Sequence, residues 1–479
     1  MLELIRKTFA TTVLAAALAG CAMHRPTYGQ LEEAPLPAQY GQIAAISAAT
    51  PARTPDAGFW QQFDDPLLAQ LVQRTLRDNL DLQVAVARLD RARALLRGQQ
   101  LDRYPTVRAQ AGASDARTSA ADAPGATRAD RDSERYHLGL TASWELDLFA
   151  RVRRGIEARG AELAASAADV EALKLVLTGA LARTYLELRG LQTRLQVATD
   201  NASNQQQTLK LVQARLDVGV GTDFDLVRAR SQLEATRARI PALQAQVARA
   251  MHRLAVLTGR SPAALLAELS PPRPLPAAPA ALAAGTPGAL LRHRPDIVAA
   301  EQRVAAASAR IGVATADLFP RFTLAGLLGT AALDSGALFE RDSESRSIAL
   351  GIDWSFLDRG RVKANIAAAE ADTHSAVASY RQTVLTAMED VENALVGYGG
   401  ARQEDTHLSA AASDSERAAQ LAHIRFDAGA INLLDVLDAE RVRLQAQDQL
   451  ADARTRSVVA LVQLWVALGG GWQGAEAST

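Results

Sequence analysis

Two proline-free stretches place the strongest limit on how this 479-residue chain can fold. They run from about 151 to 218 and from about 361 to 427. In the first stretch, apolar side chains recur at steps of three and four residues, as at Leu181, Tyr185 and Leu188, which is typical of the packed face of a helix. At about 1.5 Å per residue, such a helix would approach roughly 100 Å. The pattern predicts either a coiled-coil stalk or a helical tunnel.

Much of the chain is duplicated in tandem. DRYPTVRAQAG from Asp102 matches DLFPRFTLAGL from Asp317, and WELDLFARV from Trp144 matches WSFLDRGRV from Trp354. The matching motifs follow the same order in both halves, so we expect two copies of one structural unit. A feature that is present twice is more readily explained by architecture than by catalysis.

The duplication divides the chain into segments. Prolines between the two copies cannot continue a helix, and they predict a linker or a belt of irregular structure. Pro295 followed by Asp296 indicates the start of the next helix. The long helical hairpins are expected to turn near 219–224 and 428–434. The expected segments are a signal peptide at 1–20, a lipidated N-terminal tail at 21–65, the first repeat at 66–269, an inter-repeat segment at 270–295, the second repeat at 296–470 and a C-terminal tail at 471–479.

The N-terminus carries an export signal. Arg6 and Lys7 precede the apolar run FATTVLAAALAG, which ends in small residues. L-A-G-C at 18–21 resembles the bacterial lipobox, which implies that Cys21 is lipidated and becomes the first residue of the mature protein, although an ordinary signal peptide with an incidental cysteine is the alternative. A lipid anchor holds a protein to a membrane without spanning it. Ala22 after the cysteine favours the outer membrane, by resemblance to bacterial sorting rules.

Four segments alternate between apolar and polar residues. They lie near 104–116, 135–148, 319–330 and 346–357, and their length and period of two are typical of transmembrane β-barrel strands. A soluble β-sandwich with one wet face is the alternative. A sheet in lipid must close on itself, and four strands are too few, so we expect several chains to share one barrel. The aromatic residues that could form its interfacial girdles are Tyr104, Tyr136, Trp144, Phe319 and Trp354.

Three further motifs resemble one family of channels. They are FWQQFDDPLLAQLVQRTLRDNLDL at 59–82, RHRPDIVAAEQRV at 292–304 and DAGAINLLDVLDAER at 427–441. With the duplication and the strand pairs, they resemble the TolC family, in its lipoprotein branch that serves resistance-nodulation-division pumps. The resemblance implies an α+β membrane protein. It also implies a homotrimer in which four strands per protomer close one 12-stranded outer-membrane barrel, and long helical hairpins form a periplasmic α-barrel. The implied partners are a periplasmic adaptor, an inner-membrane resistance-nodulation-division pump and outer-membrane lipid, with no cofactor.

The two turns with similar sequences, at 215–230 and 425–440, are then expected to be the periplasmic tips of the hairpins. Gly219, Gly221 and Gly429 suit tight connections that need a positive φ. By resemblance, these tips form a gate that opens like an iris.

Charged residues beside the turns are the candidate gate. Asp435 and Asp438 lie three apart, so they share one face of a helix, and by resemblance that face borders the pore as two acidic rings. The alternative is that they cap and solvate a helix start. In the repeat alignment Asp225 matches Asp435 and Arg228 matches Asp438, so the basic partner is expected on the other tip. Ile431 stands where some relatives carry a basic residue.

Composition and motifs exclude other classes. The formal net charge of −1 gives no indication of nucleic-acid binding, and Cys21 is the only cysteine, which excludes intrachain disulfides and cysteine-based zinc clusters. No G-x-x-x-x-G-K-[ST], H-E-x-x-H or G-x-S-x-G motif is present, so neither a phosphate-loop ATPase nor an enzyme of these types is expected. We expect a passive exit duct for small molecules in a tripartite efflux pump. The alternatives are a channel for protein secretion and a periplasmic coiled-coil adaptor; the cargo stays open.

Overall fold

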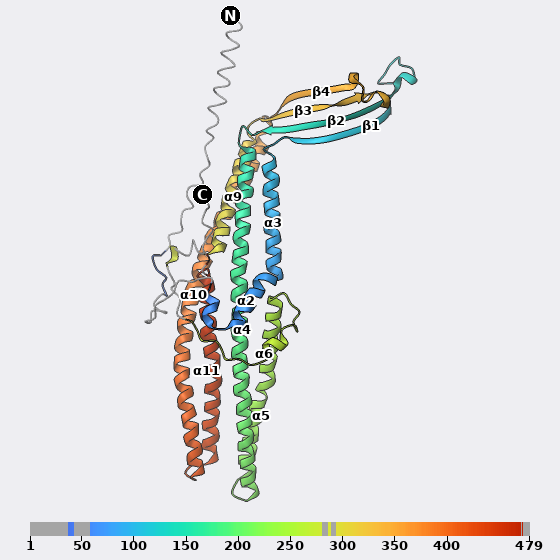
Figure 1. Ribbon diagram of the computed structural model, residues 1–479. Helices are drawn as coiled ribbons and strands as arrows, with labels where there is room; N and C mark the ends of the chain where they lie inside the picture. Colours follow the sequence, from blue (N-terminus) through green and yellow to red (C-terminus); the bar gives the residue numbers. More distant parts are fainter. Residues whose placement is uncertain (1–36, 43–57, 280–285, 289–293, 471, 473–479) are drawn as a thin grey trace. The chain divides into compact units, whose positions relative to one another are not determined.

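A computed structural model describes residues 37–42, 58–279, 286–288, 294–470 and 472. The expected signal peptide, Cys21 and most of both expected tails lie outside these residues. The chain forms two compact units, coloured along the sequence in Figure 1. Among the described residues, the first unit comprises 88–166 and 300–380, and the second comprises the rest.

The described chain is mainly helical. α4 and α10, of 67 and 69 residues, match the two proline-free stretches. Within the described residues, no helix is both long enough and apolar enough to cross a membrane. The helices are α2 (Pro66–Asp78), α3 (Leu80–Leu101), α4 (Arg151–Asp217), α5 (Asp223–Arg237), α6 (Arg239–Leu257), α7 (Leu266–Leu269), α9 (Pro295–Ala316), α10 (Arg359–Asp427) and α11 (Leu433–Ala467). Short 3-10 turns lie at η2 (Phe59–Phe63), η3 (Ala129–Arg131), η4 (Ser335–Ala337) and η5 (Arg341–Ser343).

The return arms of the two hairpins differ. α11 runs unbroken for 35 residues, whereas the arm of the first repeat is divided into α5 and α6 at Ala238. Pro241 explains the break, because it has no N–H to donate to the carbonyl of Arg237 and its ring crowds that carbonyl.

The first unit contains one antiparallel sheet in the order β1-β2-β3-β4 (Figure 1). Leu140 pairs with Leu328, and Leu324 pairs with Leu350, so the apolar residues of neighbouring strands share one face. That face is uncovered in the single chain: Leu328 is 66% exposed and Ile348 is 86% exposed. The opposite face carries mainly polar and small residues. The strands are β1 (Thr106–Arg117), β2 (Asp132–Leu146), β3 (Arg321–Ala332) and β4 (Glu344–Asp353).

Two tryptophans tie the sheet to the turns that precede it. Trp144 donates its indole N–H to the carbonyl of Arg103 at 3.0 Å, and Trp354 donates to the carbonyl of Leu318 at 3.1 Å. These contacts occupy equivalent positions in the two repeats. A tryptophan with an apolar body and one satisfied donor suits the edge of an apolar band.

The core of the second unit combines aromatic stacking with buried polar groups. Phe59 stacks on Trp465 at 5.3 Å, and Trp60 meets the same indole edge-on at 4.5 Å. Arg189 is fully buried, and its guanidinium donates to Gln192 and to the carbonyls of Leu269 and Pro271. These bonds connect α4 to the segment that leaves the first repeat.

Candidate functional site

The two hairpin turns of the second unit share one backbone geometry. α4 and α10 each end at an aspartate, and the glycine two residues later is left-handed: Gly219 has φ 77° and Gly429 has φ 71°. The next N–H groups donate back to the helices, from Val220 to the carbonyl of Arg215 and from Ala430 to the carbonyl of Arg425. Glycine satisfies this helix ending without the strain that a Cβ would cause.

Gly221 corrects the expectation that all three glycines need a positive φ. Its φ is not positive. A Cβ at this position would instead lie 3.0 Å from the backbone N of Leu216, so the close approach of the chain accounts for the glycine.

Both return helices begin with an aspartate at the third position. Asp435 accepts from the backbone N–H of Asn432 at 3.3 Å, while Asn432 accepts from the N–H of Asp435 at 3.0 Å. At the other tip the side chain of Thr222 accepts from the N–H of Asp225 at 3.1 Å, and its hydroxyl donates to the Asp225 carboxylate at 2.6 Å. The reciprocal bonds satisfy helix N–H groups that otherwise lack partners. Asp435 therefore has a capping role whatever else it does.

Asp438 lies three residues further along α11 than Asp435. It is exposed, like Asp435, while Val436 and Leu437 between them are buried. Its carboxylate pairs with Arg441 at 2.7 Å, on the same helix. Both members of this pair are more than half exposed, so it contributes little to stability. The two aspartates thus share one exposed face of α11.

An apolar cluster joins the two hairpins behind this face. Ile431 packs against it, and the guanidinium of Arg215 lies 4.7 Å from the ring centre of Phe426. Ile431 is thus part of the packing between hairpins. The buried members are Val212, Leu226, Ala229, Ala422, Phe426, Leu433, Val436 and Leu437.

Arg228 is not brought to either aspartate within one chain. It is exposed on α5, and in the described part of the chain it forms no ion pair. It lines a groove of about 620 Å³ together with Phe224 and with Arg441 of α11. An Arg228 to aspartate link would have to join neighbouring protomers.

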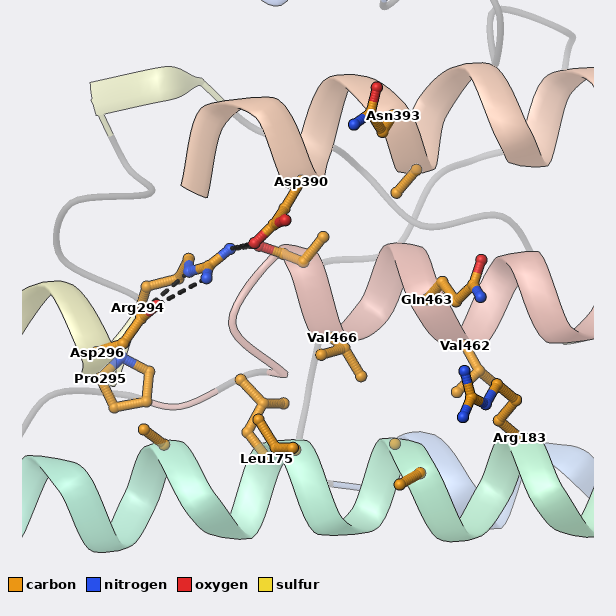
Figure 2. Close-up of a pocket in the computed structure, with 16 residues that line it drawn as sticks. Leu175, Arg183, Arg294, Pro295, Asp296, Asp390, Asn393, Val462, Gln463 and Val466 are labelled. Atoms are coloured by element: carbon orange, nitrogen blue, oxygen red, sulfur yellow. Dashed lines mark hydrogen bonds and ion pairs between the residues drawn. The ribbon is translucent and has the colours of Figure 1, made fainter. Parts of the chain in front are cut away.

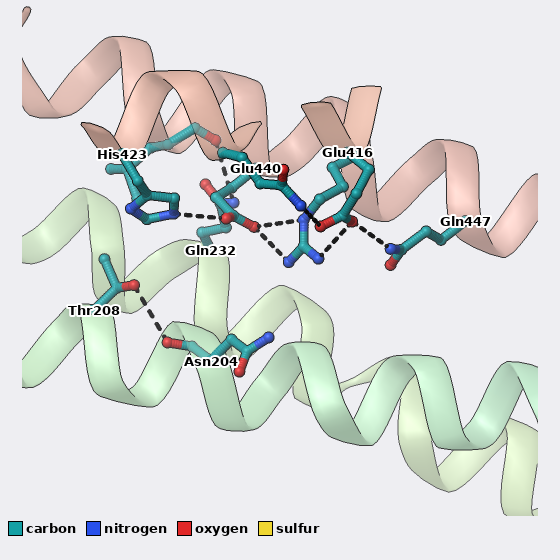
Figure 3. Close-up of polar contacts among 10 residues, drawn as sticks. Asn204, Thr208, Gln232, Glu416, His423, Glu440 and Gln447 are labelled. Carbon is teal, nitrogen blue, oxygen red and sulfur yellow. Dashed lines mark hydrogen bonds and ion pairs between the residues drawn. The ribbon is translucent and has the colours of Figure 1, made fainter. Parts of the chain in front are cut away.

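A network of charged side chains links α10 to α11 (Figure 3). Arg443 donates to Glu416 at 3.2 Å and to Glu440 at 2.7 Å, and Glu440 also meets His423 at 2.8 Å. Burial lowers the pKa of Arg443, but the hydrogen bonds and charges of Glu440 and Glu416 outweigh it and raise that pKa above its usual value. No local sequence pattern predicts this network, because its acids lie on two helices.

We expect Arg443→Ala to destabilise the hairpin. The Arg443 side chain is 12% exposed and Glu440 is 15% exposed, so the variant leaves a largely buried carboxylate without its cation. The free energy of unfolding should fall by about 1–3 kcal/mol, measured by denaturant titration followed by circular dichroism. Arg441→Ala is the matched control on the same helix. It should change stability by less than about 0.5 kcal/mol, and an equal loss in both variants would contradict the role of the network.

A second cavity, of about 540 Å³, lies between α4, α10 and α11 (Figure 2). Apolar side chains such as Leu175 and Val466 line most of it, and Arg294 closes one end. Arg294 donates to Asp296 at 2.7 Å, to Asp390 at 3.0 Å and to the carbonyl of Ala467. It fixes the start of α9 against α10 and α11. No group of three or more potential metal ligands occurs among the described residues.

Comparison with known proteins identifies the family of this chain. Residues 71–260 and 286–470 match the family described as outer membrane efflux protein. The chain belongs to this family. Its similarity to TolC-like channels, inferred from sequence, is confirmed, and so is its role in efflux at the outer membrane.

Relatives match over nearly the full length. The outer membrane protein OprJ of Pseudomonas aeruginosa is 34% identical over 462 residues, which cover 96% of this chain and 95% of OprJ. The pyoverdine export outer membrane protein OpmQ of Pseudomonas putida is 36% identical over 430 residues, which cover 88% and 89%. The solved outer-membrane channel OprN superposes with a TM-score of 0.85 at 42% identity, covering 93% of this chain and 98% of that one.

Proposed function

We propose that this protein is the outer-membrane exit duct of a tripartite efflux pump and works as a homotrimer with one shared 12-stranded barrel. The observation that carries the proposal is the four-stranded sheet. One of its faces is apolar and uncovered, the other is polar, and within the described residues β1 and β4 each pair on one side only.

Unpaired edges explain why more than one chain is needed. In lipid, the N–H and C=O groups along β1 and β4 would lack partners, at a cost of several kcal/mol for each group. Pairing β4 of one protomer with β1 of the next satisfies both edges. Three copies give twelve strands, a size within the range of closed outer-membrane barrels.

The tips supply the gate in this proposal. Asp435 and Asp438 of three protomers would form acidic rings at the periplasmic end, with Arg228 of a neighbouring protomer as the basic partner. Their exposure on one face of α11 supports this placement. A periplasmic adaptor and an inner-membrane resistance-nodulation-division pump would dock there and supply the energy. The cargo is small molecules; relatives carry names as different as pyoverdine export, toluene efflux and cation efflux.

Native mass spectrometry in detergent tests the assembly. We expect a trimer as the dominant species, because four strands per chain cannot close a barrel alone. A stable monomer, or a dimer as the largest oligomer, would contradict the shared barrel.

Cys21 is proposed as the lipid anchor. Mass spectrometry of the mature N-terminus should find an acylated Cys21 as its first residue, because L-A-G-C follows an export signal. Cys21→Ser should weaken anchoring while the trimer still assembles, since the barrel itself is held by lipid. An unmodified terminus at another residue would disprove lipidation.

A further inference from the structure

The polar face of the sheet carries an excess of positive charge. Alternation along the strands places Arg108 of β1 and both Arg135 and His137 of β2 on this face, opposite Thr141, Ser114 and Gly112. All three basic side chains are exposed. The apolar residues Leu138 and Leu140 point to the other side of the same strands.

No acid balances these cations in the middle of the face. The acids of this face are Glu145 and Asp353, and both lie at the ends of their strands that adjoin the helices. Glu145 is already paired with Arg151. Among the described residues, neither Arg108 nor Arg135 forms an ion pair. The two guanidiniums are therefore free to act on a solute.

The imidazole ring of His137 lies close against strand β1. A Cβ on Gly112 would lie 2.3 Å from Cε1 of His137, so only glycine leaves room for the ring to lie across β1. A glycine inside a strand often marks such a close approach.

We propose that this face makes the barrel lumen attractive to anions, so that the outer section of the duct favours solutes with carboxylate or phosphate groups. The inference rests on the proposed trimeric barrel, in which three copies give six guanidiniums around one water-filled lumen. Low-dielectric walls focus the field of such charges. Arginine keeps its charge at any physiological pH and grips carboxylate or phosphate with two parallel hydrogen bonds. The preference opposes that of the acidic tips, which favour cations.

Ion selectivity in planar bilayers tests the proposal. The full-length channel carrying Asp435→Asn and Asp438→Asn is used, so that the tips no longer dominate selectivity. In a KCl gradient near 0.1 M, where the Debye length is about 10 Å, this channel should prefer chloride. Adding Arg108→Gln and Arg135→Gln should lower the chloride-to-potassium permeability ratio about two- to threefold. In the channel that keeps both arginines, raising KCl to about 1 M should remove the chloride preference, because the Debye length falls to about 3 Å.

The controls separate lumen charge from other effects. Arg346→Gln removes an exposed arginine from the apolar face, where Arg346 pairs with Leu328, and should leave the ratio unchanged. Arg108→Lys with Arg135→Lys keeps the charge and should retain the preference. An unchanged ratio after the glutamine substitutions, in channels that native mass spectrometry shows to be trimers, would overturn the anion-attracting lumen alone. Absence of trimers in the wild-type protein would overturn the proposed function and this inference with it.

Discussion

The Ile348→Arg variant is expected to fail to assemble as a stable trimer in the outer membrane. Ile348 lies near the middle of β4 on the apolar face and is 86% exposed, so a single protomer loses almost no packing when it is replaced. In a barrel, however, this position faces lipid. An arginine near the bilayer midplane costs about 2–4 kcal/mol, and each trimer would carry three. The amount of trimer in outer-membrane fractions, resolved on semi-native gels, measures the effect.

Ala349→Arg is the control for Ile348→Arg. Ala349 is the next residue of β4, and its side chain lies on the polar face, opposite Ala325. The same charge there would meet water in the lumen, so assembly should proceed close to the wild-type level. If both variants assemble equally well, or equally badly, the apolar face of the sheet does not face lipid and the proposed barrel is wrong.

Local patterns predicted the elements of the fold. Alternation over 136–148 predicted β2 and its two faces, and the proline-free stretches predicted α4 and α10. Pro295 predicted the start of α9. These features depend on neighbours in sequence, which is why a single sequence reveals them. The register of β2 on β3 joins residues far apart in the chain, and no local pattern specifies it.

The candidate site was predicted less completely. The spacings N-x-x-D at Asn432 and T-x-x-D at Thr222 are capping signals that the sequence contains, and Asp438 and Arg441 have the spacing of a helical ion pair. These contacts could have been read from the sequence. The bridge from Arg443 to Glu416 depends on how α10 packs on α11, so it required the structure.

Asp435→Asn combined with Asp438→Asn should weaken the cation selectivity of the channel at its periplasmic end. Six carboxylates around a narrow neck repel each other and attract cations, and the amides remove this charge at nearly constant size. Asparagine at 435 also keeps an acceptor for the N–H of Asn432, so the helix cap is retained. The cation-to-anion permeability ratio in planar bilayers should fall about threefold or more, and block by multivalent cations should weaken.

Asp225→Asn controls for the cap. Asp225 is also hydrogen-bonded to its own N-cap residue, Thr222, on the other tip, so a loss of selectivity that came from helix fraying would appear there too. Unchanged selectivity in the double variant would mean that Asp435 and Asp438 only cap and solvate α11.

Arg228→Ala tests whether an ion pair between protomers holds the gate closed. A link from Arg228 to a carboxylate of the neighbouring protomer would hold the aperture shut with about 1–3 kcal/mol, and symmetry repeats it three times. Its removal should raise single-channel conductance. Arg228 forms no ion pair within the described part of its own chain, so its loss leaves the fold of one protomer intact. If conductance stays at the wild-type level, the tips are held by the apolar cluster around Ile431, and closure does not depend on charge.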